Sequence, residues 1–376
     1  MRDLEEIRKE IDGIDEQIVS LYEKRMKLTS DVAEYKIQTG KQIFDREREE
    51  SKLSAVTAMT NLESDKDGVR ELFEQIMAMS RKKQYQLLTS HGVVKKPEFE
   101  AVKNLDYTNA RIVFQGLEGA YSQLAMEKFF GENCDSFHVN AWKDAMNAIK
   151  DGRADYAVLP IENSSAGIVS ENYDLLVEYD NYIVGEQILS INHALLGTED
   201  AKESDITSVY SHKQSLMQCS DFLEQHPDWE KFSLNNNAVA AKKVKEDGQK
   251  NQAAIAGIKN AEIYGLKVLR NSIQNNKNNS TRFIVVTGKK IYTEDAKRIS
   301  ICFEINHESG ALYHALSHFI YNGINMTNIQ SRPLQNKNWE YRFFVDFEGN
   351  FKEEAVINAL RGLKAETISF RILGTY

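Results

Sequence analysis

The chain has 376 residues, of which 41% are hydrophobic and 27% are charged, which is enough apolar material for two or three ordinary domains. Its formal net charge of −9 argues against a nucleic-acid partner, and no apolar run approaches the roughly 18 residues of a membrane span. The three cysteines are isolated, which excludes a disulfide framework, so the sequence favours a cytoplasmic protein.

A long amphipathic helix is predicted from Asp3 to Thr39. Its apolar residues, called the seam below, recur at helical spacing: Leu4, Ile7, Ile11, Ile14, Ile18, Leu21, Leu28, Val32 and Tyr35. Arg25 interrupts the seam, while Arg8 and Lys36 lie one residue beside it. A buried guanidinium needs an anion against it, because it cannot lose its proton. The helix is therefore predicted to bind a small, negatively charged molecule.

The length of this helix predicts a partner. At about 1.5 Å per residue it spans roughly 50 Å, more than a compact unit of about 90 residues can cover. Arg8 and Arg25 lie about 25 Å apart along the axis, too far to hold one small molecule within one chain. We predict a homodimer or higher homo-oligomer in which Arg8 reaches the partner's site. A coiled-coil dimeriser with Arg25 setting the register is the alternative.

Two more helices are predicted to share a pocket with the first. The second opens at a polar cluster, Asp45, Arg48 and Glu49. The third runs from about Asp67 to Thr89, and its apolar face continues with Ser80 and Gln84, where leucine would be expected. Polar groups on an apolar face of each helix indicate one shared polar pocket.

Residues 1–90 resemble the all-helical chorismate mutase family. The matching motifs are R-K-E-I-D-G-I-D, E-K-R-M-K-L, Lys36, D-R-E-R-E at 45–49, and Ser80 with Gln84. The resemblance implies a chorismate site made of Arg8 from a partner, Arg25, Lys36, Asp45, Arg48, Glu49, Ser80 and Gln84. In it the arginines bind the two carboxylates, Lys36 and Gln84 donate to the ether oxygen, and Glu49 holds the hydroxyl. Such a Claisen rearrangement needs no cofactor, only a compact conformer and donors where negative charge develops.

A linker is predicted at residues 91–108, and an α/β domain with parallel strands at residues 109–290. The predicted strands are Arg111–Gln115, Ala154–Pro160, Ile183–Leu196, Ile206–Ser211, Ala253–Gly257 and Arg282–Thr287. Polar clusters follow or precede these strands, at 116–122, 160–167, 211–218 and 278–282. Because ligands bind at the carboxyl ends of strands in open α/β sheets, we expect the clusters to line one cleft between two lobes. The first cluster lacks the spacing of the dinucleotide-binding G-x-G-x-x-G motif.

The motifs P-I-E-N-S at 160–164 and N-N-S-T-R-F at 278–283 make this region similar to prephenate dehydratase. The resemblance implies a two-lobed fold like that of periplasmic binding proteins, with prephenate in the cleft. The implied site residues are Ser122, Glu162, Asn163, Ser211, Gln218, Thr281 and Arg282. Thr281 would be essential for loss of the ring hydroxyl as carbon dioxide leaves. Glu162 is the candidate proton source, with an N-cap or an interlobe salt bridge as its alternative role. The chain departs from the family pattern at Lys213 and at Asn237-Ala238.

Residues 298–376 are predicted to form a ferredoxin-like domain of order βαββαβ. They resemble a phenylalanine-sensing ACT domain, and the effector residues implied are Gly310, Ala311, Leu312, Ser331, Arg332 and Pro333. Gln330 stands where that family commonly has glutamate. The alternative is a dimerisation module that senses nothing.

The three resemblances together imply an enzyme of phenylalanine biosynthesis that converts chorismate to prephenate and prephenate to phenylpyruvate, with phenylalanine as feedback effector. No metal site is expected, because His314 and His318 do not form an H-E-x-x-H motif, and Cys219 is interpreted as a structural thiol. The alternatives are a non-catalytic amino-acid sensor, a mutase with a degenerate second domain, and a mutase fused to a dehydrogenase. The missing dinucleotide fingerprint opposes the last of these.

Overall fold

The computed structural model describes residues 2–92, 97–334 and 340–376, and the chain divides into two compact units. The first unit comprises Met1–Glu98 and Lys297–Ile372, and the second comprises Phe99–Ala296 and Leu373–Tyr376. Two predictions fall partly outside the described residues: positions 93–96 of the linker, and Trp339 at the start of a predicted strand. Among the described residues, no helix has the length and hydropathy that crossing a membrane requires.

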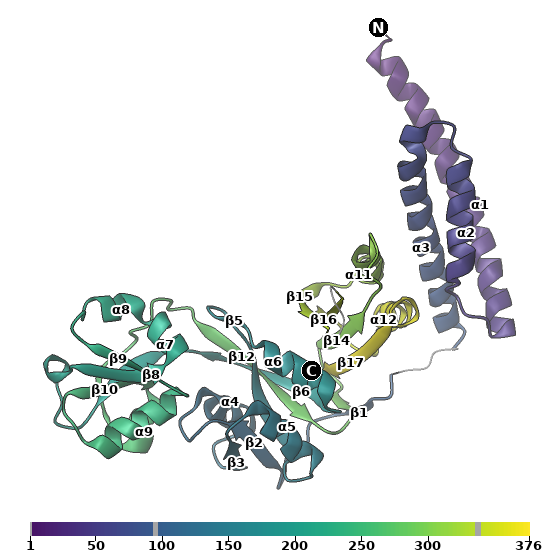
Figure 1. Ribbon diagram of the computed structural model, residues 1–376. Coiled ribbons are helices and arrows are strands. Elements are labelled where there is room, and N and C mark those ends of the chain that lie inside the picture. The colour runs from purple at the N-terminus through teal and green to yellow at the C-terminus, as the bar shows by residue number, and fades with distance from the viewer. Residues whose placement is uncertain (1, 93–96, 335–339) are drawn as a thin grey trace. The chain divides into compact units, whose positions relative to one another are not determined.

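The first unit begins with the three predicted helices, α1 (Leu4–Thr39), α2 (Arg46–Ala58) and α3 (Lys66–Ser90), which are seen together in Figure 1. A short 3-10 turn, Glu63–Asp65, precedes α3. Asp45 caps α2, because its side chain accepts a hydrogen bond of 3.1 Å from the backbone N–H of Arg48. An all-helical N-terminal region is thus confirmed.

The face that α1 buries within one chain is not the seam. Met26, Thr29 and Ala33 are the buried residues of α1, and α1 packs against α3. Most of the seam remains 46–64% exposed, at Leu4, Ile11, Ile14, Ile18, Leu21, Leu28, Val32 and Tyr35. An apolar stripe of this length is rarely left in water. Its exposure agrees with the prediction that a single chain cannot cover α1.

The C-terminal part of the first unit follows the predicted order of strands and helices. Its elements are β14 (Arg298–Glu304), α11 (Ala311–Tyr321), β15 (Met326–Pro333), β16 (Tyr341–Glu348), α12 (Glu354–Glu366) and β17 (Ser369–Thr375). The strand order is β15-β16-β14-β17, and β16 is antiparallel to both of its neighbours. Helices α11 and α12 pack against each other and contact α3.

The second unit contains one large sheet in each lobe (Figure 1). The first-lobe sheet has the order β6-β12-β4-β2-β3, from Tyr182–Ser190, Ser280–Thr287, Tyr156–Asn163, Arg111–Gln115 and Asp135–Val139. Strands β1 (Glu100–Val102) and β13 (Ile291–Thr293) form a separate two-stranded sheet, and the short strand β5 (Gly167–Ile168) pairs with β4 of the first-lobe sheet. Its helices are α4 (Tyr121–Phe130), α5 (Trp142–Lys150) and α6 (Ser170–Glu178). Ile112, Phe114 and Phe283 belong to its core.

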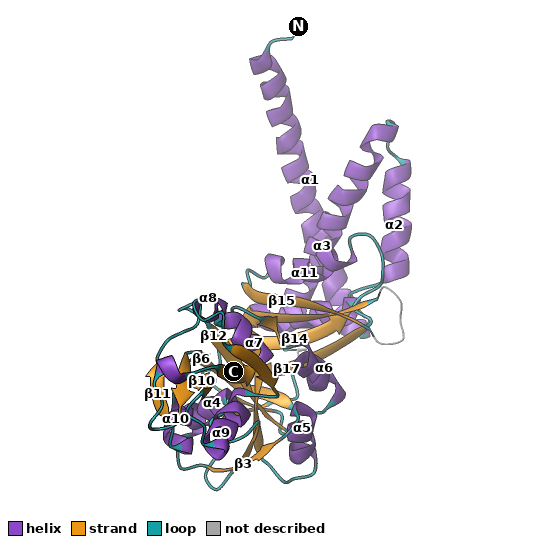
Figure 2. Cartoon of the chain, turned by 60° about the vertical axis from the view of Figure 1, so that its left-hand side comes forward, coloured by secondary structure: helices purple, strands orange, loops and turns teal. Residues whose placement is uncertain are grey.

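The second-lobe sheet has the order β11-β7-β10-β8-β9, from Lys267–Arg270, His193–Gly197, Gln252–Gly257, Ser208–His212 and Glu230–Leu234. Its helices are α7 (Lys213–Gln218), α8 (Ser220–Glu224), α9 (Asn237–Asp247) and α10 (Lys259–Tyr264), and a 3-10 turn lies at Glu203–Asp205. Strands in the second unit are flanked by these helices, as Figure 2 shows by colour. An α/β fold for this region is therefore confirmed.

Two details of the predicted strands were wrong. The run Ile183–Leu196 is not one strand but two, β6 and β7, which belong to different sheets. The break lies at the polar residues Ser190 and Asn192, between the partly exposed end of β6 and the buried strand β7. The sheets are also mixed rather than parallel, since β12 is antiparallel to β4 and β6, and β7 is antiparallel to β10 and β11. The chain crosses between the lobes at these strands and returns in the opposite direction.

Candidate active sites

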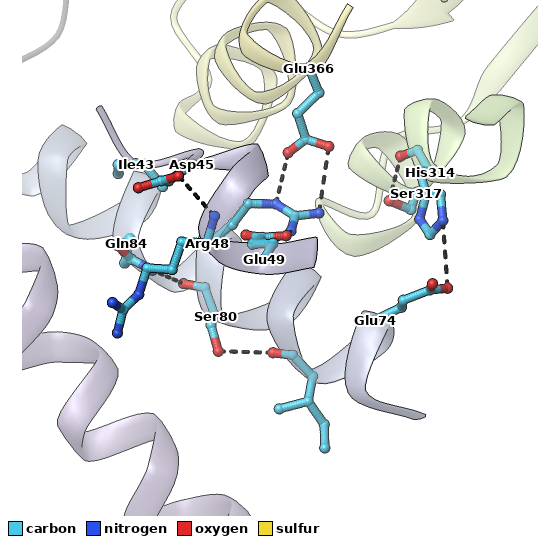
Figure 3. Close-up of polar contacts among 12 residues, drawn as sticks. Ile43, Asp45, Arg48, Glu49, Glu74, Ser80, Gln84, His314, Ser317 and Glu366 are labelled. Atoms are coloured by element: carbon cyan, nitrogen blue, oxygen red, sulfur yellow. Dashed lines mark hydrogen bonds and ion pairs between the residues drawn. The ribbon is translucent and has the colours of Figure 1, made fainter. Parts of the chain in front are cut away.

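A cavity of about 460 Å³ lies among α1, α2 and α3. It is lined by all of the predicted chorismate residues except Arg8: Arg25, Lys36, Asp45, Arg48, Glu49, Ser80 and Gln84. Its lining combines cations and hydrogen-bond donors with apolar side chains such as Leu28, Val32 and Met77. Such a cavity is suited to a small anion that also has an apolar part. Figure 3 shows Asp45, Arg48, Glu49, Ser80 and Gln84 around it.

Arg25 is held in this cavity by Ser80. Its Nη1 donates to Ser80 Oγ at 2.5 Å, and the Ser80 hydroxyl donates in turn to the backbone carbonyl of Ile76 at 2.8 Å. Burial lowers the pKa of Arg25, and the nearby Tyr22 and Glu49 oppose that effect. The guanidinium stays protonated, because arginine does not titrate in the physiological range. Ser80 therefore fixes the direction of a permanent positive charge in the cavity.

Lys36 is tied to the turn between α1 and α2. Its Nζ donates to the carbonyl oxygen of the buried residue Ile43 at 2.6 Å. An ammonium group has three donors, so two remain for a ligand. Burial lowers the pKa of Lys36, whereas the carboxylates of Asp45 and Glu49 raise it. The ammonium is thus positioned by the backbone and kept charged by its acidic neighbours.

Gln84 is a buried amide with spare hydrogen-bonding capacity. Its Nε2 donates to the Ser80 carbonyl at 3.3 Å, while its Oε1 is buried and has no protein partner. Buried polar side-chain atoms are nearly always paired in proteins. Nε2 keeps a second hydrogen that it can donate to a ligand, whereas Oε1 can only accept one.

A pH profile tests whether Gln84 donates as a neutral group. We expect the mutase kcat/KM to vary only a few-fold between about pH 5 and 8, because Arg, Lys and Gln keep one protonation state there. Gln84→Glu should lose activity as the pH rises, since glutamate donates only when protonated. At higher pH the unchanged protein should also lose activity, earlier than an ordinary lysine would, because burial lowers the pKa of Lys36. Parallel profiles for both proteins would contradict a donor role for Gln84.

Arg8 lies outside the cavity. It is exposed on the N-terminal half of α1, the part of the helix that extends past α2 and α3 in Figure 1. The structure therefore does not bring Arg8 together with the other predicted chorismate residues within one chain.

Arg81 lines the cavity, although sequence reasoning did not select it. It belongs to a run, Arg81-Lys82-Lys83, that is typical of a solvated helix face, yet its side chain is only 8% exposed. It donates to the Glu49 carboxylate on α2. Its position four residues after Met77 and four before Tyr85, both buried, is the signal that could have revealed it.

A second polar site surrounds Thr281 in the second unit. Asn163 Nδ2 donates to Thr281 Oγ1 at 2.8 Å and to Asn279 Oδ1 at 2.9 Å. Asn279 Nδ2 donates in turn to Gln218 Oε1 at 3.1 Å. Three residues of the predicted prephenate site, Asn163, Gln218 and Thr281, are thus joined through Asn279. The Thr281 hydroxyl, which accepts from Asn163, keeps its own hydrogen for another acceptor.

The network continues to His193 on β7, which sequence reasoning also missed. His193 Nε2 lies 3.0 Å from Gln218 Oε1, and Nδ1 lies 3.2 Å from the hydroxyl of Tyr121. Because the Gln218 oxygen can only accept, Nε2 carries the hydrogen. Burial lowers the pKa of His193, and the hydrogen bond with Gln218 opposes that effect. The available signal was a polar residue at the start of an apolar run, since His193 directly precedes Ala194, Leu195 and Leu196.

Glu162 and Arg282 lie on the other face of the sheet from Thr281. Asn163 pairs with Thr281 in the ladder of β4 and β12, and Glu162 pairs with Arg282, so the two pairs point to opposite faces. Arg282 Nε lies 3.5 Å from Glu162, and Nη1 lies 3.6 Å from Glu186. The structure therefore does not bring Glu162 to Thr281. Glu162 lies beside Arg282 within the first-lobe sheet, so this pair is not the interlobe salt bridge that was one of its alternative roles.

Ser211 and Ser122 lie outside the hydrogen-bonded chain to Thr281. Ser211 Oγ, which is fully buried, contacts the Ile255 carbonyl at 2.6 Å and Asn237 Oδ1 at 3.0 Å. Asn237, one of the departures from the family pattern, thereby connects Ser211 to the start of α9. Ser122 is buried in the first turn of α4, and its neighbour Tyr121 is the residue that reaches the network.

One of the two predicted effector segments lines a cavity of about 170 Å³ in the first unit, and the other lies on the strand next to it. Ala311 and Leu312 line it together with Tyr341 and Phe343 of β16. In the ladder of β15 and β16, Ser331 pairs with Phe343 and Pro333 pairs with Tyr341, with Arg332 between them. Gly310 precedes α11 at φ 79°, a conformation that a side chain would strain. His314 and His318 are not metal ligands here but contact Glu74 at 3.7 Å and Glu366 at 3.1 Å.

The fold and these sites define an enzyme with two separate polar centres, one for a small anion in the helical part and one in the two-lobed unit. The chain matches two protein families in the same places: "Chorismate mutase type II" over residues 7–85 and "Prephenate dehydratase" over residues 112–291.

Similar proteins span nearly the whole chain. A bifunctional chorismate mutase/prephenate dehydratase of Pseudomonas aeruginosa is 33% identical and covers 99% of this chain and 97% of its own length. That of Aquifex aeolicus is also 33% identical, covering 100% and 98%. A solved prephenate dehydratase of Arthrobacter aurescens, in complex with L-Phe, is 27% identical with a TM-score of 0.66, covering 71% of this chain and 89% of that one.

This chain therefore belongs to the bifunctional chorismate mutase/prephenate dehydratase family. It catalyses the rearrangement of chorismate to prephenate and the decarboxylative dehydration of prephenate to phenylpyruvate, two steps of phenylalanine biosynthesis.

Proposed function

We propose that the cavity of α1, α2 and α3 is the chorismate site, with the roles that the sequence predicts for its residues. The convergence of Arg25, Lys36, Arg48 and Gln84 on one cavity of about 460 Å³ carries this proposal. The arginines bind the carboxylates, Lys36 and Gln84 donate to the ether oxygen, and Glu49 accepts from the hydroxyl. No residue acts as a nucleophile, because a pericyclic reaction needs only orientation and stabilised charge.

We further propose that Arg8 completes the chorismate site of a second copy of the chain. The exposed seam and the distance of Arg8 from the cavity support a homodimer built along α1. The proposed domains are the mutase at 1–90, a linker at 91–108, the dehydratase at 109–290 and an ACT domain at 298–376.

Mixed dimers test the shared site. Arg8→Ala and Arg25→Ala should each be nearly inactive as mutases, because each removes a cation that binds a carboxylate of chorismate. When the two variants are unfolded and refolded together, mixed dimers contain one site with both arginines, so part of the activity should return. Each variant refolded alone is the control. Lack of recovery in verified mixed dimers would contradict sharing across the interface.

In the dehydratase, we propose that Thr281 acts at the ring hydroxyl of prephenate, positioned by Asn163 and Asn279. The hydrogen bonds of Asn163 to Thr281 Oγ1 and of Asn279 to Gln218 support this role, because they place the hydroxyl at the junction of the two lobes. Glu162 is not proposed as the proton source, because it lies on the other face of the sheet from Thr281. Glu162 and Arg282 instead form a salt bridge, together with Glu186, on the opposite face of the sheet.

We propose that phenylalanine binds the ACT domain at Gly310–Leu312 and Ser331–Pro333 and inhibits the dehydratase. Ala311 and Leu312 line this cavity, Ser331 and Pro333 pair with the lining residues Phe343 and Tyr341, and the similar Arthrobacter structure holds L-Phe. With a coupling of about 1–3 kcal/mol, a prephenate analogue should weaken phenylalanine binding roughly 5–150-fold, because linkage is reciprocal. Calorimetry with and without the analogue measures this factor. Equal binding to the Ser331→Ala, Arg332→Ala double variant would contradict the proposed site.

A further inference from the structure

Arg81 lies between two carboxylates that come from distant parts of the first unit. Its Nη1 donates to Glu49 on α2, and its Nε lies 2.8 Å from Glu366 Oε1 at the end of α12. Its Nη2 lies 3.5 Å from the other oxygen of Glu366. The planar guanidinium of Arg81 therefore contacts Glu49 of the mutase cavity with one edge and Glu366 of the C-terminal part of the first unit with another.

This contact is buried and charged. The side chains of Arg81 and Glu366 are 8% and 9% exposed, and that of Glu49 is 22% exposed. Burial opposes the charge of Arg81, but Glu366 and Glu49 together raise the pKa of Arg81 above its ordinary value. Burial likewise opposes ionisation of Glu366, but His318 and Arg81 lower the pKa of Glu366. The three groups are therefore a charged cluster shielded from water, where ion pairs are least screened.

Arg81 is fixed from the side away from the cavity. Glu366 contacts His318 Nε2 at 3.1 Å, and the His318 ring lies against Gly362, where a Cβ would come within 2.3 Å of Nδ1. The ring of Phe44 lies 5.3 Å from the guanidinium, within the range of a cation–π contact. Arg81 thus has little freedom to turn, and Nη1 points in one direction. Arg81, Glu49 and Met77 separate the mutase cavity from a neighbouring one of about 310 Å³.

We propose that Arg81 is a positioning residue of the mutase, which orients the Glu49 carboxylate toward the substrate hydroxyl and is itself fixed by Glu366 of α12. The inference rests on the role proposed above for Glu49. Because Nη1 engages Oε2 of Glu49, the other oxygen is left to accept from the substrate. An unrestrained glutamate would instead sample several rotamers and would lose that freedom only on binding. The mutase then depends on a residue near the end of the chain.

A double-mutant cycle in the full chain tests this dependence. Arg81→Met should lower kcat/KM for chorismate about 10–100-fold, the scale of a misplaced binding group. Glu49→Gln should lower kcat/KM at least as much. The loss should be divided between kcat and KM in the same way as in Arg81→Met. The double variant should be no worse than Glu49→Gln, because Arg81 acts through Glu49. Turnover of supplied prephenate should stay normal in all three proteins.

Conservative and matched variants separate positioning from folding. Arg81→Lys should restore part of the activity, since it keeps the charge but not the planar fork. Glu366→Gln should cost less than Glu366→Leu, because only glutamine offers Arg81 an acceptor. The control is Arg70→Met, which breaks another pair between α3 and α2, with Glu50 at 3.3 Å. Arg70 does not line the 460 Å³ cavity, so its loss should leave kcat/KM within about two-fold.

The possible outcomes distinguish this inference from the proposed site. Normal kcat/KM in Arg81→Met, or losses that multiply in the double variant, would overturn the inference and leave the role of Glu49 intact. Normal kcat/KM in Glu49→Gln would overturn both. If Arg81→Met does not fold, as judged by circular dichroism, the cycle is run with Arg81→Lys and Glu366→Leu, and the same comparisons decide.

Discussion

Lys36→Ala should lower the mutase kcat about 10²–10³-fold, the usual cost of removing one preorganised donor from developing negative charge. The ammonium is held by the Ile43 carbonyl at 2.6 Å, so its direction is set before chorismate binds. Its loss removes a charge that the remaining residues of the cavity cannot replace. The measurement is single-substrate kinetics with chorismate, followed by the same preparation with supplied prephenate.

The dehydratase rate of Lys36→Ala should be near normal, because Thr281 and its network lie in the other unit. Lys24→Ala is a matched control, since Lys24 is exposed on the same helix and does not line the cavity. Equal loss of both activities in Lys36→Ala would show that the helical cavity is not a separate active site.

Thr281→Val should abolish most of the dehydratase activity, with a loss of about 10²–10⁴-fold, the contribution that positioned proton-transfer groups typically make. Valine keeps the shape of threonine but removes the hydroxyl that Asn163 contacts at 2.8 Å. Thr281→Ser should retain more activity than Thr281→Val, because it keeps the hydroxyl. Conversion of prephenate to phenylpyruvate is the measurement.

Thr287→Val serves as the control for Thr281→Val. Thr287 is buried at the other end of β12 and lies outside the polar network. Its replacement should leave dehydratase kinetics unchanged even if it lowers stability slightly. A Thr281→Val protein with normal turnover would remove the hydroxyl from the proposed mechanism, whereas mutase activity should be normal in both variants.

Much of the mutase cavity could be predicted from local patterns. Helical periodicity identified α1, α2 and α3, and polar residues that interrupt their apolar faces, such as Arg25, Ser80 and Gln84, turned out to line one cavity. This works because side chains three or four positions apart share a helix face. A residue that is polar on an apolar face is thus visible in the sequence alone. The order of strands and helices at the C-terminus could likewise be predicted, because strands and helices have different hydrophobic periods.

Patterns of alternation were less informative in the two-lobed unit. The run Ile183–Leu196 was predicted as one strand, although Ser190 and Asn192 lie at the point where β6 ends and β7 enters the other sheet. The neighbouring residues Glu162 and Asn163 were assigned to one site, yet they point to opposite faces of β4. Strand alternation predicts that separation only once the strand is known to extend through Asn163.

The sequence by itself determined which polar residues of the three helices line the helical cavity, because their spacing along each helix sets the face that they share. Only the tertiary structure decided what holds those residues in place. Arg81 appears in the sequence as one of three successive cations, and Glu366, its partner, is 285 positions away. His193 likewise meets Gln218 and Tyr121 only after the two lobes have formed. Contacts between distant segments depend on how whole elements pack, and no local period in the chain records them.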